Sequence, residues 1–353
     1  MSVKRILIDP RCKFNYASYY ILGIYELYGT SRIKYKILDY QISSYRDLQK
    51  GFGFQICYED GKFVKVFVDT NDTNSIYETF YDWCDVYAKV NVSIADITKK
   101  KIFPIGPSFG VRLWPPLKTI WVALLNYTKV RKANDSYKIP LKLYLKDYLY
   151  TIYRRLNFSE YTAEYTDDKN YVFAMSTLWY DWVSLRNTNK YRGEFIRICQ
   201  QLYENFEGGL FYIQEVESIF PPYKRYKELF KDVLTTKRIG MRKYLQGTRR
   251  SSIVFNTPSV CLCHGWKLAE YLSMGKAIIS TPLSNVMPGD FIDGVHYLCC
   301  TDVESMKLMI ESLQYDEKKR EMLKCNAKKY FEEYLSPNAV VKRIFERAYL
   351  CRN

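Results

Sequence analysis

Residues 251–282 decide the fold, and they read SSIVFNTPSVCLCHGWKLAEYLSMGKAIISTP. Ser252–Asn256 is a short apolar run, typical of a strand buried in a parallel sheet. After a loop, Gly265–Met274 has the residue spacing of a helix, and Gly275 follows where a left-handed residue commonly ends one. A second apolar strand, Lys276–Ser280, comes next. This order of strand, loop, helix and strand predicts a doubly wound α/β domain.

The same alternation recurs on both sides of this stretch. At the N-terminus, Val3–Ile8 predicts a buried strand, Ala17–Tyr28 a helix and Tyr35–Asp39 a second strand. Phe52–Tyr58 and Lys62–Val68 alternate around a Gly-containing turn and predict a β-hairpin. The remaining expected strands are 85–90, 171–176, 209–214 and 296–299, and the remaining expected helices are 74–81, 192–205, 221–234, 241–248, 303–313, 317–335 and 337–349.

The start of helix 265–274 carries the chemistry. Lys267 falls in its first turn, where the helix dipole is positive and a cation is misplaced unless an anion is present. The N–H groups of Gly265 and Trp266, together with the Lys267 ammonium, would hold a diphosphate. Glu270 lies one turn further, where a carboxylate can accept hydrogen bonds from ribose hydroxyls. An ordinary surface ion pair between Lys267 and Glu270 is the alternative.

This segment resembles the donor-binding core of GT-B glycosyltransferases, in the exostosin-like or glycosyltransferase family 4-like pattern. The residues that carry the resemblance are Gly265-x-Lys267-x-x-Glu270, the apolar strand that follows, and the stretch 290–297 around Asp293-Gly294. The resemblance implies that Lys267 contacts the pyrophosphate and Glu270 the ribose. Many retaining members carry a Glu eight residues before the ribose Glu. Leu262 stands there, which leaves the anomeric outcome open.

The resemblance implies an α/β fold of GT-B type, with two Rossmann-like, doubly wound domains facing across a cleft. A length of 353 residues suits two domains. We expect an N-terminal acceptor-side domain over 1–160, a polar linker over 161–170 and a nucleotide-sugar-binding domain over 171–336. The last helix, within 337–353, would cross back towards the N-terminal domain.

The candidate site residues follow from this comparison. We expect a second phosphate contact from a loop over Asn187–Arg192, after the first strand of the C-terminal domain. The catalytic candidates are Asp9, which ends the first strand where open α/β sheets place ligands, and His264. The donor-binding candidates are Lys190, Arg192, Thr257, His264, Gly265, Trp266, Lys267 and Glu270.

No metal and no cofactor is expected besides the nucleotide-sugar substrate. The ten Cys lack the paired spacing of a zinc site, and there are only two His, at 264 and 296. No Asp-x-Asp motif and no GxGxxG fingerprint is present. We therefore expect a metal-independent enzyme that transfers a hexosyl or related group. Because no leader pattern precedes the ten Cys, we expect them to be reduced and the protein to be cytoplasmic.

The net charge of +15 has three interpretations: an anionic substrate, an anionic membrane surface or nucleic acid. Lys and Arg are spread along the chain without a basic arm, so no nucleic-acid partner is expected. Residues 114–160 are rich in Leu, Tyr, Lys and Arg. They predict either helices packed on the domain or a face that contacts a membrane on its cytoplasmic side.

The sequence therefore predicts a glycosyltransferase that moves a sugar from a nucleotide-sugar donor to a glycan or lipid-linked glycan, in bacterial surface polysaccharide synthesis. One alternative is a GT-B-fold nucleotide-sugar epimerase or phosphorylase-like enzyme. The other is a non-enzymatic basic protein that binds nucleic acid or a membrane surface.

Overall fold

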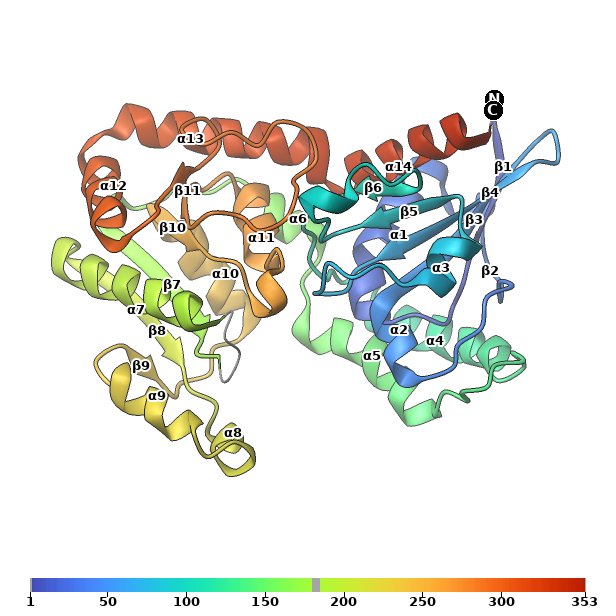
Figure 1. Ribbon diagram of the computed structural model, residues 1–353, viewed down its shortest axis with the longest axis horizontal. Coiled ribbons are helices and arrows are strands. Elements are labelled where there is room, and N and C mark those ends of the chain that lie inside the picture. Colours follow the sequence, from blue (N-terminus) through green and yellow to red (C-terminus); the bar gives the residue numbers. More distant parts are fainter. Residues whose placement is uncertain (1, 180–184, 353) are drawn as a thin grey trace. The chain divides into compact units, whose positions relative to one another are not determined.

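The computed structural model describes residues 2–179 and 185–352 and divides into two compact units. Unit 1 comprises residues 1–160, 285–289 and 333–353, and unit 2 comprises residues 161–284 and 290–332. Each unit is an α/β structure with parallel strand pairs, so the predicted α/β class is confirmed (Figure 1). The segment 285–289, which the sequence did not single out, belongs to unit 1, where Val286 N–H donates to the Val92 carbonyl at 2.8 Å.

Unit 1 contains a six-stranded mixed sheet in the order β2-β1-β3-β4-β5-β6. Strand β3 is inserted between β1 and β4 and runs antiparallel to both, while the other neighbours are parallel. The predicted hairpin therefore occupies the middle of the sheet. The strands are β1 (Val3–Ile8), β2 (Ile33–Tyr35), β3 (Gly51–Tyr58), β4 (Phe63–Asp69), β5 (Val86–Lys89) and β6 (Ile102–Pro104).

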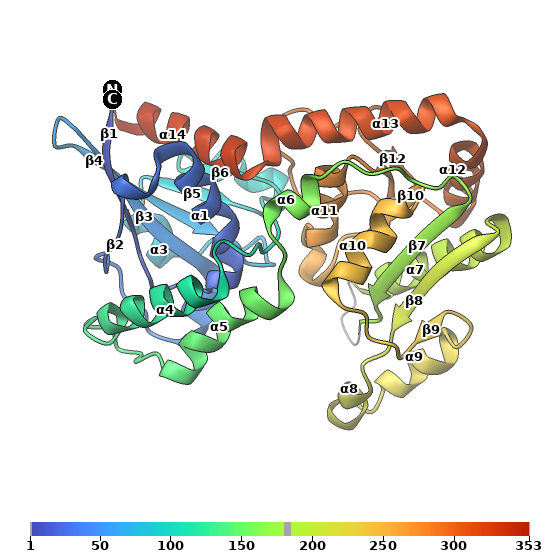
Figure 2. The ribbon, with the colours of Figure 1, turned by 180° about the vertical axis from the view of Figure 1, so that it is seen from behind.

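Helices α1 and α14 lie side by side against the unit 1 sheet, although they come from opposite ends of the sequence (Figures 1 and 2). Helices α4 and α5 pack on each other, and α5 also contacts α1. The helices that start in this unit are α1 (Phe14–Tyr28), α2 (Tyr45–Lys50), α3 (Glu78–Trp83), α4 (Pro116–Val130), α5 (Leu141–Arg154), α6 (Phe158–Thr162) and α14 (Pro337–Arg352). None of the described helices is long and apolar enough to cross a bilayer.

Unit 2 contains two three-stranded parallel sheets, β7-β8-β9 and β10-β11-β12. They adjoin where Ser252 N–H donates to the Tyr171 carbonyl at 2.9 Å, which places β10 beside β7. The strand order is therefore β9-β8-β7-β10-β11-β12, that of a doubly wound domain. The strands are β7 (Tyr171–Thr177), β8 (Asn205–Phe211), β9 (Leu234–Thr235), β10 (Ile253–Asn256), β11 (Ala277–Ser280) and β12 (Leu298–Cys299).

Helices cover both faces of this sheet. Val172 joins a core cluster with side chains of α7 and α12, while its neighbour Phe173 faces the other way and packs on Tyr244 of α10. Alternation along β7 therefore buries both faces, as a parallel sheet requires. The helices are α7 (Leu185–Leu202), α8 (Gln214–Ile219), α9 (Tyr223–Leu229), α10 (Met241–Arg250), α11 (Trp266–Met274), α12 (Val303–Tyr315) and α13 (Glu317–Tyr330).

Two predicted elements are wrong in instructive ways. The strand expected over Tyr35–Asp39 ends at Tyr35, because Leu38 N–H donates to the Asp9 carboxylate instead of to a neighbouring strand. The loop expected over Asn187–Arg192 lies inside helix α7. Its first turns are polar and lack the apolar period by which a helix is recognised.

The contact between α1 and α14 depends on Gly23. A Cβ atom at this position would lie 2.1 Å from the Pro337 carbonyl oxygen and 2.8 Å from Cγ2 of Val341. Both neighbours belong to the first turns of α14. The two helices can therefore cross this closely only because residue 23 has no side chain.

Gly23→Ala should lower the free energy of unfolding by about 1–3 kcal/mol, because the added methyl group forces the helices apart. Helix propensity alone predicts the opposite sign, since Ala stabilises a helix interior relative to Gly by about 0.5–1 kcal/mol. Thermal or urea denaturation of the full chain measures the sign directly. A variant more stable than the wild type would contradict the close crossing.

Candidate functional site

The candidate site lies at the carboxyl edge of the unit 2 sheet, between β7 and β10. The chain leaves β7 towards β8 and β9, and it returns to β10 to continue towards β11 and β12. The strand order reverses between these two strands. In open α/β sheets, ligands bind outside the carboxyl ends of the strands at this reversal.

Lys267 reaches this edge from the first turn of α11. Its Nζ donates to the Ser176 hydroxyl at 2.7 Å and to the Met175 carbonyl, both near the end of β7. Burial is the main cause that lowers the pKa of Lys267 to about 7; the nearby positive charge of Arg192 acts in the same direction, and Glu270 acts in the opposite one. The half-buried ammonium has therefore lost part of its water and lies near a second cation.

Arg192 is that second cation, and it comes from α7. Its Nε donates to the Thr257 hydroxyl at 3.0 Å, and its guanidinium also donates to the Thr177 carbonyl at 3.2 Å. Burial lowers the pKa of Arg192 to about 10. The acceptors that hold Arg192 and Lys267 are thus neutral oxygens. In the described part of the chain, neither cation lies within 4.0 Å of a carboxylate oxygen in an ion pair.

The amino end of α11 lies in the same region. Gly265 is the residue before the helix and has no side chain that could accept from the first N–H groups. His264 is buried, and Trp266 is half-buried. In the preceding loop Cys261 and Leu262 both have positive φ, 55° and 59°, which is rare for residues with a side chain. Strain of this kind gathers at functional sites.

Glu270 is covered by Tyr244 of α10, which does not fit the alternative of a surface ion pair. It is 5% exposed and accepts a hydrogen bond from the Tyr244 hydroxyl at 3.1 Å. Tyr244 also lies beside Lys267, whose Nζ is 5.9 Å from the ring centroid. Burial is the main cause of the raised pKa of Tyr244, with a smaller contribution from the Tyr271 hydroxyl and from Glu270. The simple surface ion pair between Lys267 and Glu270 is therefore replaced by a buried Tyr–Glu contact.

The structure thus brings together most of the residues singled out from the sequence. Arg192 donates to Thr257 and its charge acts on Lys267, and Gly265 and Glu270 belong to the same end of α11. Tyr244 and Ser176 were not predicted. Ser176 could have been found, because it ends an expected strand at the edge where ligands bind. Tyr244 gave no signal in a sequence with 34 Tyr.

Lys190 lies apart from this cluster. It is exposed and lines a hollow of about 550 Å³ with Phe220, Pro222 and Arg225. Residues two positions apart on a helix point in directions about 200° apart, so Lys190 and Arg192 cannot face the same ligand from α7. The role expected for Lys190 depended on a loop that the structure replaces with a helix.

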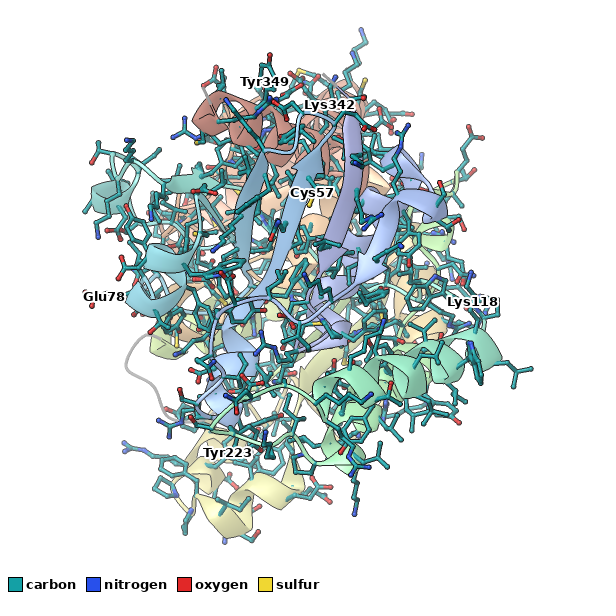
Figure 3. All side chains as sticks on the ribbon, turned by 90° about the vertical axis from the view of Figure 1, so that its right-hand side faces the viewer. Cys57, Glu78, Lys118, Tyr223, Lys342 and Tyr349 are labelled. Atoms are coloured by element: carbon teal, nitrogen blue, oxygen red, sulfur yellow. The ribbon has the colours of Figure 1, made fainter. Side chains whose placement is uncertain are left out.

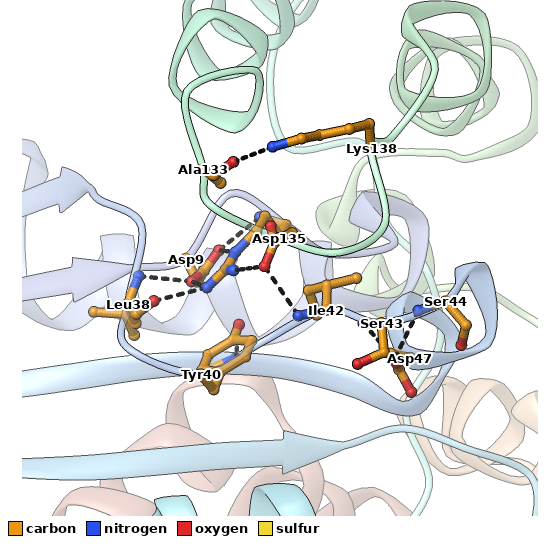
Figure 4. A network of polar contacts seen from close by, with 12 residues as sticks. Asp9, Leu38, Tyr40, Ile42, Ser43, Ser44, Asp47, Ala133, Asp135 and Lys138 are labelled. Atoms are coloured by element: carbon orange, nitrogen blue, oxygen red, sulfur yellow. Dashed lines mark hydrogen bonds and ion pairs between the residues drawn. The ribbon is translucent and has the colours of Figure 1, made fainter.

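Asp9 belongs to a buried network within unit 1 (Figure 4). Its carboxylate is fully buried and accepts from the Arg11 backbone, from the Arg11 guanidinium at 2.7 Å and from Leu38 N–H at 2.8 Å. Arg11 also donates to Asp135 at 2.6 Å, which in turn accepts from Ile42 N–H. These contacts tie three loops together. They favour a structural role for Asp9 over the catalytic role expected from its position.

Comparisons with known proteins give structural similarity only. No family model matches the chain, and no curated protein matches it. It is similar to HepE (Alr3699) of Anabaena, solved with UDP and glucose, at a TM-score of 0.43 and 11% identity over 77% of this chain and 65% of that one. It is similar to a glycosyltransferase of Rickettsia africae at a TM-score of 0.40 and 11% identity, over 78% of this chain and 68% of that one. It is similar to TarM at a TM-score of 0.43 and 8% identity, over 79% of this chain and 47% of that one.

The chain spans less than two thirds of HepE and about half of TarM. With TM-scores below 0.5 and identities near one tenth, this similarity does not determine what the chain binds or transfers.

If an anion binds at Lys267, its affinity should depend on pH. A diphosphate favours the protonated ammonium, so above a pKa of about 7 the free protein must take up a proton to bind it. The affinity for a nucleoside diphosphate should then fall by up to roughly tenfold per pH unit from about pH 7.5 to 9.5, a range in which the ligand itself (pKa about 6) is already ionised. Calorimetric titration in buffers of different ionisation enthalpy measures both affinity and proton uptake.

Lys267→Arg is the matched control for this titration, because a guanidinium stays protonated throughout the range. Lys276 is also buried, with a pKa lowered to about 7 by burial, but it is present in both proteins and cancels in the comparison. Equal pH dependence in the wild type and in Lys267→Arg would assign the titration to another group.

A structural role for Asp9 predicts a loss of stability. Asp9→Asn removes one anionic partner of the buried Arg11 charge, and breaking a buried pair costs about 3–5 kcal/mol. Asp39→Asn is the control, since Asp39 is exposed, its pair with Lys65 lies at the surface, and such pairs contribute at most about 1 kcal/mol. Chemical denaturation of both variants measures the difference. Similar small effects would contradict the structural assignment.

Proposed function

We propose that this chain is a glycosyltransferase of GT-B type that binds the diphosphate of a nucleotide-sugar donor between β7 and β10 of unit 2. The observation that carries the proposal is the pair of desolvated cations, Lys267 and Arg192, held by neutral oxygens at the point where the strand order reverses. A diphosphate supplies the negative charge that this arrangement lacks. The amino end of α11 adds N–H groups and a favourable dipole.

Different residues would contact different parts of the donor. Lys267 and Arg192 would contact the phosphates, and Gly265 would let the α11 backbone approach them because it has no side chain. The Glu270 carboxylate, held by Tyr244, is one turn along α11 and would accept from ribose hydroxyls. Trp266 and His264 flank the helix start and would contact the donor near the phosphates.

The same cations would assist transfer. When the bond between sugar and phosphate breaks, negative charge develops on the leaving diphosphate. Fixed cations in a place with little water stabilise such charge strongly. We propose that Lys267 and Arg192, rather than a divalent metal, neutralise the leaving diphosphate. The acceptor is a glycan or a lipid-linked glycan, and surface polysaccharide synthesis is the process that such a transfer would serve.

The direct test is a thermal-shift panel of UDP, GDP, ADP and UDP-glucose with the full chain. A ligand that binds only the folded state raises the melting temperature, by an amount that follows its concentration relative to Kd. At least one nucleoside diphosphate should do so. Glu270→Gln should lower the affinity for that ligand by about tenfold or more, because the amide cannot accept two charge-assisted hydrogen bonds from a ribose.

Glu217→Gln is the matched control, since Glu217 accepts from the Tyr212 hydroxyl at 2.8 Å elsewhere in unit 2. It should leave the ligand shift unchanged. If no nucleotide shifts the wild type, or if both glutamate variants behave alike, the site is wrong. Transfer of labelled sugar from the responding donor, with and without EDTA, then separates a transferase from an epimerase and tests metal independence.

A further inference from the structure

Helix α4 exposes its large apolar side chains to solvent, whereas an ordinary surface helix buries them. The face that it turns towards unit 1 carries Thr119, Ala123, Asn126 and Val130, all buried. The face that it turns to solvent carries five large apolar side chains. They are Leu117, Ile120, Trp121, Leu124 and Leu125, with exposed fractions of 84%, 38%, 63%, 42% and 45%.

We call these five residues the α4 apolar face. They recur at intervals of three and four residues, so they form one continuous stripe along the helix. Scattered apolar residues on a surface need no explanation, but a contiguous stripe marks an interaction site. The buried face of α4 carries Thr119, Ala123, Asn126 and Val130, so the larger apolar side chains of this helix are the exposed ones. Packing within unit 1 therefore does not account for the stripe.

The charges of the segment that carries the stripe are mostly positive. The segment Pro116–Arg154, which contains α4 and α5, has eight Lys and Arg against two Asp. Both acids are used within unit 1: Asp135 pairs with Arg11 at 2.6 Å, and Asp147 accepts from Asn15 N–H at 2.8 Å. The two acids of this segment are thus already in contact within unit 1, whereas exposed basic residues lie on both helices and on the connection between them, and we call these the basic border. They include Lys118, Arg131, Lys132, Lys142, Lys146 and Arg154.

The figures place this surface at the margin of unit 1. Figure 3 shows Lys118 at the start of α4, with the outward side chains of the helix projecting away from the sheet. Helix α5 lies against α4. It adds the exposed Tyr153, with an exposed fraction of 78%.

The charge decides between occupants. A second copy of this chain, related by a two-fold axis, would bring the same basic surface against itself, and like charges would repel. An anionic bilayer satisfies both features, because apolar side chains enter the acyl boundary while Lys and Arg remain at the headgroups. Trp121 suits the same boundary, having an apolar ring and a polar N–H edge.

We infer that the α4 apolar face and its basic border form a peripheral binding surface for an anionic lipid bilayer. This inference rests on α4 and α5 alone and does not depend on the nucleotide site of unit 2. Its failure would therefore leave the proposed transferase activity untouched, and the reverse also holds.

Vesicle co-sedimentation of the full chain tests it. The vesicles are phosphatidylcholine alone and phosphatidylcholine with about one third phosphatidylglycerol, at low and at physiological salt. The test variant is Leu117→Gln, Trp121→Gln and Leu124→Gln combined. The matched control is Ile219→Gln, Leu229→Gln and Leu308→Gln combined, because these residues are also apolar and exposed, at 80%, 59% and 58%, but lie on unit 2.

The wild type should bind the anionic vesicles about tenfold or more tightly than the neutral ones, with a loss of binding as salt rises. The test variant should lose about tenfold or more of that binding, while the control keeps it and both keep the wild-type melting temperature. Quenching of tryptophan fluorescence by brominated lipid should fall in Trp121→Phe, which places this ring in the bilayer.

Three results would overturn the inference. The first is equal binding by the wild type and the test variant. The second is equal binding to neutral and anionic vesicles. The third is self-association of the wild type in the absence of lipid, measured by sedimentation equilibrium and abolished by the test variant, which would assign the face to a second copy of the chain.

Discussion

Two half-buried cationic side chains, whose hydrogen bonds end on neutral oxygens, lie near each other at the carboxyl edge of the unit 2 sheet. Lys267 and Arg192 arrive from different helices, α11 and α7, and their hydrogen bonds end on the last residues of β7 and on Thr257 after β10. Like charges this close raise the free energy of the folded chain unless an anion joins them. The fold tolerates the arrangement because β7, β10 and α7 share a buried apolar cluster, and α11 buries Leu268, Ala269 and Leu272. The anion binding proposed for the site and the electrostatic cost of the empty site thus have the same origin.

Much of this fold could be predicted because apolar runs are punctuated by residues with a definite backbone preference. Strand β1 was expected over Val3–Ile8 and occupies those residues. Helix α11 ends where Gly275 takes a left-handed conformation, with φ of 62°. The prediction failed where partners distant in sequence decide the structure. Nothing near β3 shows that it would be inserted between β1 and β4, and nothing near Leu38 shows that the Asp9 carboxylate would take its N–H group.

The candidate site shows the same division. A Lys in the first turn of α11 indicated an anion from local electrostatics alone, and Gly265 marked the helix start. Arg192 lies near Lys267 because α7 begins at Leu185. The first turns of α7 are polar and lack an apolar period, so the sequence did not predict a helix there. The burial of Glu270 by Tyr244 required α10 to pack on β7, which no local pattern encodes. Asp9 was singled out for its position at a strand end, but three neighbouring loops use its charge for structure.

The return of α14 to unit 1 has a consequence for biosynthesis. Unit 1 holds the first 160 residues, yet it is completed by the last residues of the chain, which cover α1, β4 and β5. A ribosome adds those residues only after it has made the whole of unit 2. The N-terminal unit must therefore wait with an uncovered apolar surface while the whole of unit 2 is made and can fold. Unit 2 can therefore complete its fold before unit 1, in the order opposite to that of synthesis, and a nascent chain that ends before Pro337 exposes the apolar surface that α14 later covers.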